Sequence, residues 1–103
     1  MSAQNLTSKE RAYLRTLANT LEPIFQFGKG GVSENYIKQL EEALEARELI
    51  KISILENADA DVKELASILC EKAHCQSVQI IGRKIVLYRQ ARDKDKRKIV
   101  LPK

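Results

Sequence analysis

Residues 24–34 read IFQFGKGGVSE, and the rest of the chain is organised around them. Three of the four residues 28–31 are glycine, which permits positive φ angles and lets the backbone approach another molecule closely. Ser33 is a good N-cap for a helix that begins at Glu34, and the positive dipole end of that helix should point the same way as the loop. A strand, a glycine loop with Lys29 at its tip and a helix start favour a binding site for phosphates. The alternative is a strand–helix turn that needs glycine only for its geometry.

Helical periodicity lies on both sides of this stretch. We predict helices over 8–20, 34–47 and 62–74. Thr7 and Glu10 form a capping box before the first helix, and Asp61 is positioned to cap the third. Pro23 ends the first helix, because the residue before proline avoids the α region.

Runs of β-branched and apolar residues predict the sheet. We expect strands over 24–27, 49–55, 77–81 and 84–90. Gly82-Arg83 fits a type II′ hairpin turn, so Arg83 and Lys84 would project at its tip. The predicted order is α-β-α-β-α-β-β, an α/β chain with a mixed four-stranded sheet and packed helices, in which the strands within 24–55 are parallel.

Length and composition indicate one soluble domain. The chain has 103 residues, of which 44% are hydrophobic and 31% charged. No apolar run approaches the ~20 residues of a membrane span, and the N-terminus lacks a signal-peptide pattern. We therefore expect a monomer that works in the cytoplasm and not in a membrane.

Opposite charges are segregated along the chain. Residues 34–71 hold four basic and ten acidic side chains, whereas residues 83–103 hold nine basic and two acidic ones. A segregated basic surface suggests a polyanionic partner. We divide the chain into an N-terminal tail (1–7), a domain (8–91) and a basic C-terminal tail (92–103). Residues 92–98 should be solvated and mobile, and residues 99–101 could return as a short edge strand.

The residues of common catalytic and metal sites are missing from the pattern. Lys29 is not followed by Ser or Thr, as a nucleotide-binding P-loop requires, and the chain has one histidine. Cys70, His74 and Cys75 invite a metal interpretation but have no second ligand cluster to join, so free thiols near a helix end are the better interpretation. We expect no catalytic residues, no metal and no cofactor.

Four segments together resemble a known family. They are RAYLRTLA (11–18), PIFQFGKGG (23–31), RELIKI (47–52) and QIIGRKIVLYR (79–89). In order and spacing they resemble the CRM domain, and most closely its stand-alone bacterial form, the YhbY-like proteins. The resemblance covers about residues 8–90.

The resemblance implies a fold and a function. CRM domains bind RNA, and their fold is similar to that of the C-terminal domain of translation initiation factor 3. Their GxxG loop is likened to that of KH domains, which clamps the nucleic-acid backbone. Single-domain bacterial members are associated with precursors of the large ribosomal subunit, whereas plant members with several such domains act in organelle intron splicing. A single domain favours the ribosomal role.

The main hypothesis is therefore a non-catalytic protein that binds ribosomal RNA during large-subunit assembly. The candidate RNA-binding residues are Gly28, Lys29, Gly30, Gly31, Arg11, Arg15, Arg83 and Lys84. The arginines and lysines among them must be weighed against plain surface charge, and Phe25 and Phe27 are better assigned to the core than to base stacking. The alternative is a protein-interaction adapter that docks through the acidic helix 34–47.

Overall fold

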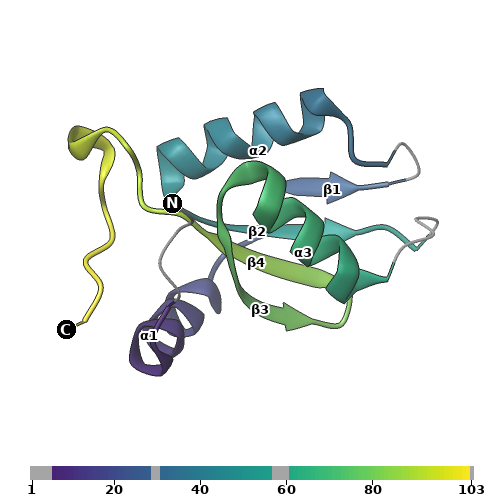
Figure 1. Cartoon of the computed structure of the whole chain (residues 1–103). Coiled ribbons are helices and arrows are strands. Elements are labelled where there is room, and N and C mark those ends of the chain that lie inside the picture. Colours follow the sequence, from purple (N-terminus) through teal and green to yellow (C-terminus); the bar gives the residue numbers. More distant parts are fainter. Residues whose placement is uncertain (1–5, 29–30, 57–60, 103) are drawn as a thin grey trace.

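A computed structural model describes residues 6–28, 31–56 and 61–102. Within these residues, helices and strands follow in the predicted order α-β-α-β-α-β-β (Figure 1). They are α1 (Ser8–Ala18), β1 (Phe25–Phe27), α2 (Glu34–Arg47), β2 (Leu49–Ile54), α3 (Val62–Ala73), β3 (Gln76–Ile81) and β4 (Lys84–Tyr88). The predicted fold class is confirmed; both predicted ends of α2 are correct, and the other predicted ends are correct or differ by one or two residues.

The predicted caps fix where the helices begin. The Thr7 hydroxyl accepts from the Glu10 amide at 3.0 Å, and the Glu10 carboxylate accepts from the Thr7 amide at 2.9 Å, which completes the capping box. Asp61 accepts from the Lys63 amide at 3.1 Å. Helix α3 stops at Ala73 because His74 takes the left-handed conformation, with φ of 57°.

The four strands form one mixed sheet in the order β1-β2-β4-β3. Strands β1 and β2 are parallel, as the strand–helix–strand pattern predicts, and β4 pairs antiparallel with both β2 and β3. Gly82 in the hairpin turn has φ of 57°, which suits the first central residue of a type II′ turn. The pairing of β3 with β4 is irregular between Ser77 and Gln79.

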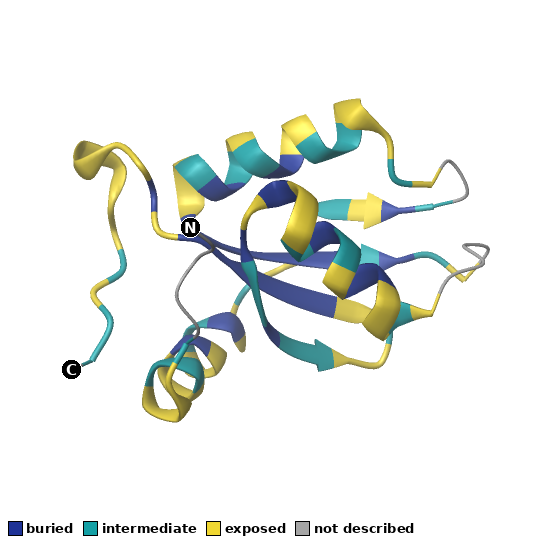
Figure 2. Ribbon diagram, in the orientation of Figure 1, coloured by how far each residue is buried: buried dark blue, intermediate teal, exposed yellow. Residues whose placement is uncertain are grey.

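Helices cover both faces of the sheet and give two core clusters. Helices α2 and α3 lie on one face, where the cluster includes Ile50, Ile52 and Ile54 of β2 (Figure 2). Helix α1 lies on the other face, where Leu14 packs near Val86 and its neighbours. The side chains that alternate along β2 therefore pack into two core clusters, one on each face of the sheet, and neither face of β2 is a solvent surface.

The C-terminal residues differ from their prediction. Residues 94–96 form a 3₁₀ turn, η1 (Lys94–Lys96), and the residues after it return to the body without forming a strand. Ile99 and Leu101 are partly buried against the α1 core cluster. The return of this segment was correctly predicted, but an edge strand at 99–101 was wrong.

Candidate functional site

One end of the sheet gathers the loops that the sequence singles out. Phe27 is the register partner of Ile54, so the C-terminal ends of β1 and β2 lie together. Strand β4 starts at the same end, where Lys84 faces Ser53 on one side and Ile81 on the other. The glycine loop leaves β1 at this end of the sheet. The same end holds the starts of α2 and α3 and the turn between β3 and β4 (Figure 1).

Leu55 connects the glycine loop to the hairpin. Its amide donates to the Phe27 carbonyl at 2.9 Å, and a Cβ atom added to Gly28 would meet its Cδ1 at 3.2 Å. From the other side, Arg83 donates from Nη2 to the Leu55 carbonyl at 2.6 Å and from Nε to the Ile54 carbonyl at 3.1 Å. The prediction that Arg83 projects from the hairpin tip is wrong, because its guanidinium folds back and ties the hairpin to the end of β2.

The two described glycines of the loop serve different needs. Gly28 is half-buried, and a side chain there would require Leu55 to shift by a few tenths of an ångström. Gly31 is exposed with φ of 73°, and nothing lies within 4 Å of the position of its missing Cβ. The candidates Lys29 and Gly30 lie outside the described residues. Backbone at Gly31 is thus open to another molecule, whereas backbone at Gly28 packs against the protein.

The start of α2 is fixed against β1. The Ser33 hydroxyl accepts from the Tyr36 amide at 3.0 Å. The Tyr36 ring meets Phe27 edge-on at 5.4 Å and lies 6.4 Å from Phe25, measured between ring centroids. Burial raises the pKa of Tyr36 to about 12, so its hydroxyl is neutral at physiological pH. Phe25 and Phe27 pack with the core, as expected, and orient the helix N-terminus beside the loop.

The two arginines of α1 lie elsewhere. Arg11 is half-buried and donates from Nη1 to the carbonyls of Ser77 and Val78, early in β3. Strand β3 runs from there toward the hairpin, so about four residues, or roughly 13 Å, separate this contact from the end at Ile81. Arg15 is exposed on α1. The structure therefore does not bring Arg11 together with the glycine loop, and it uses Arg11 to join α1 to the sheet.

Exposed cations at the loop end include one that the sequence analysis missed. Lys84 is exposed at the first position of β4, as predicted. Lys63 is also exposed, in the first turn of α3. It could have been predicted, because the helix that follows a parallel strand starts at the same end of the sheet as that strand finishes. Beside the start of α2 lies a hollow of about 410 Å³ whose lining is of mixed charge, with apolar Val32 and Ile37 beside Glu34, Lys38, Glu41, Glu71 and Lys72.

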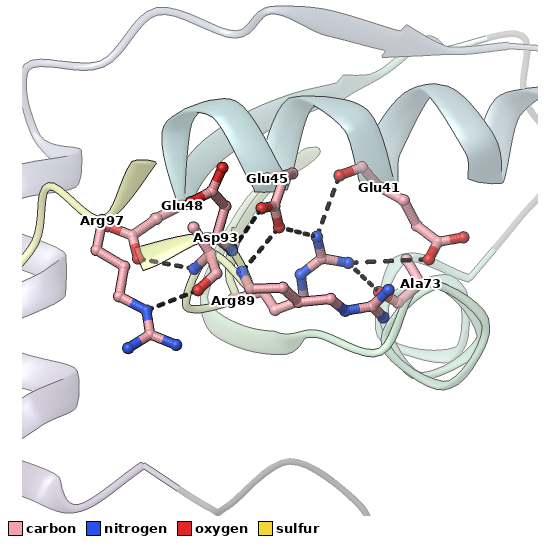
Figure 3. A network of polar contacts seen from close by, with 9 residues as sticks. Glu41, Glu45, Glu48, Ala73, Arg89, Asp93 and Arg97 are labelled. Carbon is pink, nitrogen blue, oxygen red and sulfur yellow. Dashed lines mark hydrogen bonds and ion pairs between the residues drawn. The ribbon is translucent and has the colours of Figure 1, made fainter. Parts of the chain in front are cut away.

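The acidic side of α2 is not simply a solvent face. Arg89, the residue after β4, donates from Nη2 to Glu45 Oε1 at 3.1 Å and forms a longer ion pair with Glu41 at 3.8 Å (Figure 3). Arg89 itself is buried, with 9% of its side chain exposed. Glu34 and Glu42 are exposed, as expected for this face. The helical spacing of the acids predicts a solvent face that carries Glu34, Glu41, Glu42 and Glu45. That prediction is wrong for Glu41 and Glu45, whose charges are partly used inside the molecule.

The thiols of Cys70 and Cys75 influence each other. The Cys75 thiol donates to the Leu69 carbonyl at 3.9 Å. Its interaction with Cys70 lowers the pKa of Cys70 and, together with burial, raises the pKa of Cys75. Both cysteines are free, and His74 is exposed at the end of α3. Over residues 6–28, 31–56 and 61–102, no group of three or more potential ligands lies placed to hold a metal ion. The helices of that same part of the chain are too short or too polar to cross a bilayer.

Comparison with known proteins adds to this geometry. The CRS1 / YhbY (CRM) domain family matches residues 6–89. "Probable RNA-binding protein YqeI" of Bacillus subtilis is 50% identical over 97 residues, which cover 94% of this chain and 99% of that protein. "RNA-binding protein" of Haemophilus influenzae is 33% identical over 99 residues, 95% of this chain and 96% of that protein. The solution structure of the hypothetical protein SAV1595 from Staphylococcus aureus matches with a TM-score of 0.75 and 48% identity, covering 95% of this chain and 100% of that one.

Proposed function

Because the chain belongs to the CRS1 / YhbY (CRM) domain family, we propose that it is a non-catalytic RNA-binding protein. Its bacterial relatives are named RNA-binding proteins and have nearly its whole length in common with it. We propose further that the RNA is ribosomal, in a precursor of the large subunit, and that a monomer binds it in the cytoplasm. The glycine loop 28–31 is the proposed point of contact.

The observation that carries this proposal is the open backbone beside a helix N-terminus. Gly31 exposes its backbone, and Ser33 begins α2 two residues later. The first amides of any helix lack partners within it and carry the positive end of its dipole, which favours a phosphate there.

Nearby charges support the same contact. Lys63 and Lys84 are exposed at this end of the sheet, and Lys29 belongs to the loop itself. Each lysine would neutralise a phosphate without reading a base, because phosphate contacts position the protein while base contacts give specificity. Since Phe25 and Phe27 pack in the core cluster, they do not offer a stacking platform of the kind found in RRM domains. Recognition would then depend on RNA shape and backbone.

The decisive experiment maps the RNA in cells. Ultraviolet crosslinking of the tagged chain, followed by sequencing of the attached RNA, should enrich precursor RNA of the large ribosomal subunit. The crosslinked peptide should contain residues 28–31. Crosslinks spread evenly over messenger RNA would contradict the ribosomal role while leaving RNA binding intact. An absence of crosslinked RNA would contradict the proposed function.

The adapter hypothesis makes the opposite prediction about salt. RNA binding through phosphates weakens steeply as salt rises, because bound counterions are released. Capture of a protein partner through a packed interface should tolerate the same change. Glu42→Lys, on the exposed side of α2, should abolish adapter binding but leave or improve RNA binding.

A further inference from the structure

A buried carboxylate organises the chain after β4. Glu48, immediately after α2, has none of its surface exposed. Its Oε2 accepts from the Ala91 amide at 2.8 Å, and its Oε1 accepts from the amides of Lys98 and Ile99 at 2.7 and 2.9 Å. Such charge-assisted bonds offset the loss of water around a buried carboxylate. The carboxylate of Glu48 therefore fixes the backbone at both ends of residues 91–99.

Glu45, one turn earlier on α2, holds the start of the same segment. Its two oxygens accept from the amides of Arg92 and Asp93, each at 2.9 Å (Figure 3). Arg97 closes the segment on itself by donating from Nε to the Ala91 carbonyl at 2.8 Å. Partly buried Ile99 and Leu101 then attach the chain to the α1 core cluster. The sequence-based expectation of a mobile tail at 92–98 therefore differs from the structure, in which the main chain is bound at both ends.

With the amides of Arg92, Asp93 and Lys98 bound by Glu45 and Glu48, this segment presents its side chains to solvent. We call residues 92–98 the basic segment. All seven of its side chains are exposed, five of them basic and two acidic, so its net charge is +3. Asp93 accepts from the Asp95 amide at 3.0 Å and caps the 3₁₀ turn. The carboxylates of Glu45 and Glu48 thus bind the main chain of the segment, while its basic side chains face solvent. This arrangement suits the binding of a polyanion.

The basic segment and the glycine loop lie at opposite ends of α2 (Figure 1). Helix α2 has 14 residues and is therefore about 20 Å long. Exposed Glu42 lies on the helix between the two ends and would repel RNA laid along it, whereas Glu34 is the first residue of the helix, at the end of the glycine loop. One straight strand along α2 is therefore disfavoured, and the two ends would meet separate parts of a folded RNA.

We propose that the basic segment is a second phosphate-binding site for RNA, held in a defined position by Glu45 and Glu48. This inference rests on the proposed RNA-binding function. It adds that the segment acts as an ordered surface and not as a loose cationic tail. An ordered surface loses less conformational entropy on binding than a mobile one, so its attachment to α2 should strengthen RNA binding.

The first arm of the test removes cations. The triple variant Lys94→Gln, Lys96→Gln, Lys98→Gln keeps every backbone bond of the segment, and the RNA probe is labelled poly(U). Three lost phosphate contacts should make the slope of log affinity against log salt shallower by about 2. Between about 50 and 200 mM salt, the wild type should therefore lose about 20-fold more affinity than the variant. An unchanged slope would overturn the inference.

The second arm removes a negative charge from either of two positions on the same helix. Glu45→Gln weakens the attachment of the segment, whereas Glu42→Gln removes an exposed acid near it. If the segment were merely cationic, both changes should tighten RNA binding. The inference predicts that Glu42→Gln leaves binding equal or tighter while Glu45→Gln weakens it several-fold, with faster amide exchange at Arg92 and Asp93. Tighter binding by both variants would overturn it.

The two proposals fail separately in this design. If the wild type does not bind poly(U) or ribosomal RNA, the proposed function fails and the inference fails with it. If the wild type binds RNA and both arms give wild-type affinities, the inference alone fails. Thermal unfolding on the same samples shows that each variant is folded, and Glu45 is the variant site of choice because it is less buried than Glu48.

Discussion

At the scale of residues, the glycine loop combines a structural and an open position. Gly28 lies against Leu55, and any side chain there must displace the Leu55 methyl group. Gly31 has open space but a positive φ of 73°, which costs L residues roughly 1–2 kcal/mol. Geometry alone therefore explains glycine at both described positions. Only measurements of stability and RNA affinity on the same variants separate the turn from the phosphate site.

Gly31 offers a matched pair of substitutions. We predict that Gly31→Ala lowers the free energy of unfolding by about 1 kcal/mol, because alanine tolerates positive φ poorly. Gly31→Asn should cost less, since asparagine visits that region more readily. Both place a side chain where a phosphate is proposed to approach, so both should weaken RNA binding. Urea unfolding and RNA titration test this, and wild-type affinity in a stable Gly31→Asn variant would return Gly31 to a purely geometric role.

Glu45 gives the basic segment a predicted dependence on pH. Its pKa lies below the ordinary value of 4.5, chiefly because the amide of Arg92 donates to the carboxylate and next because that of Asp93 does. A lowered folded-state pKa means that this stabilisation is present above the unfolded pKa and is lost as pH falls through the folded pKa. We expect the Arg92 and Asp93 amides to exchange faster as pH falls below about 4.5, after correction for intrinsic rates. Glu45→Gln should abolish this pH dependence, and equal profiles for both proteins would contradict the assignment.

At the scale of elements, the sequence predicted those helix starts and strands that depend on residues close together in the chain. Capping residues at Thr7, Ser33 and Asp61 fixed three helix starts, and alternation along β2 identified a strand. The attachment of residues 91–99 had no such signal, because it depends on carboxylates more than 40 positions away in sequence. The folding back of Arg83 is equally nonlocal, since its acceptors lie on β2.

The C-terminal element should therefore contribute to stability as well as charge. Deleting residues 92–103 removes two of the three amides that bind Glu48 and the apolar contacts of Ile99 and Leu101. A buried carboxylate left short of donors and the lost apolar burial together should cost about 2–4 kcal/mol. A solvated, mobile tail could be deleted without loss of stability, whereas the observed bonds to Glu48 predict a loss. Urea unfolding measures the loss, and the triple Lys→Gln variant is the control, expected within about 0.5 kcal/mol of the wild type. Equal stability of the truncated chain would show that the segment is not anchored.

At the scale of the whole molecule, the charge segregation visible in the sequence becomes a spatial one. The acidic residues 34–71 include α2, whose carboxylates partly bind Arg89 and the C-terminal segment, while the basic residues 92–98 lie beyond the C-terminal end of that helix. The order of strands in the sheet could not be predicted from periodicity, and that order places the hairpin beside the glycine loop through β2. The candidate site was thus half predicted: Lys84 lies near the loop, whereas Arg11 does not.

The two proposed contact regions should act independently. For four or five phosphate contacts in total, the wild-type slope of log affinity against log salt on single-stranded RNA should be about −3. Lys29→Ala should make the slope shallower by about 0.7, and the triple variant of the basic segment by about 2. Sites about 20 Å apart share no partners, so the losses in binding free energy should add in the combined variant.

The measurement is a salt titration of all four proteins against poly(U) and against a folded ribosomal RNA fragment. On the folded RNA, losses that add are expected when one RNA molecule contacts both regions at once, whereas a combined loss greater than the sum would show that either region alone can hold the RNA, so that each single change is compensated by the other region. A combined loss equal to the larger single loss would show instead that the basic segment and the glycine loop serve the same phosphates, contrary to their separation along α2.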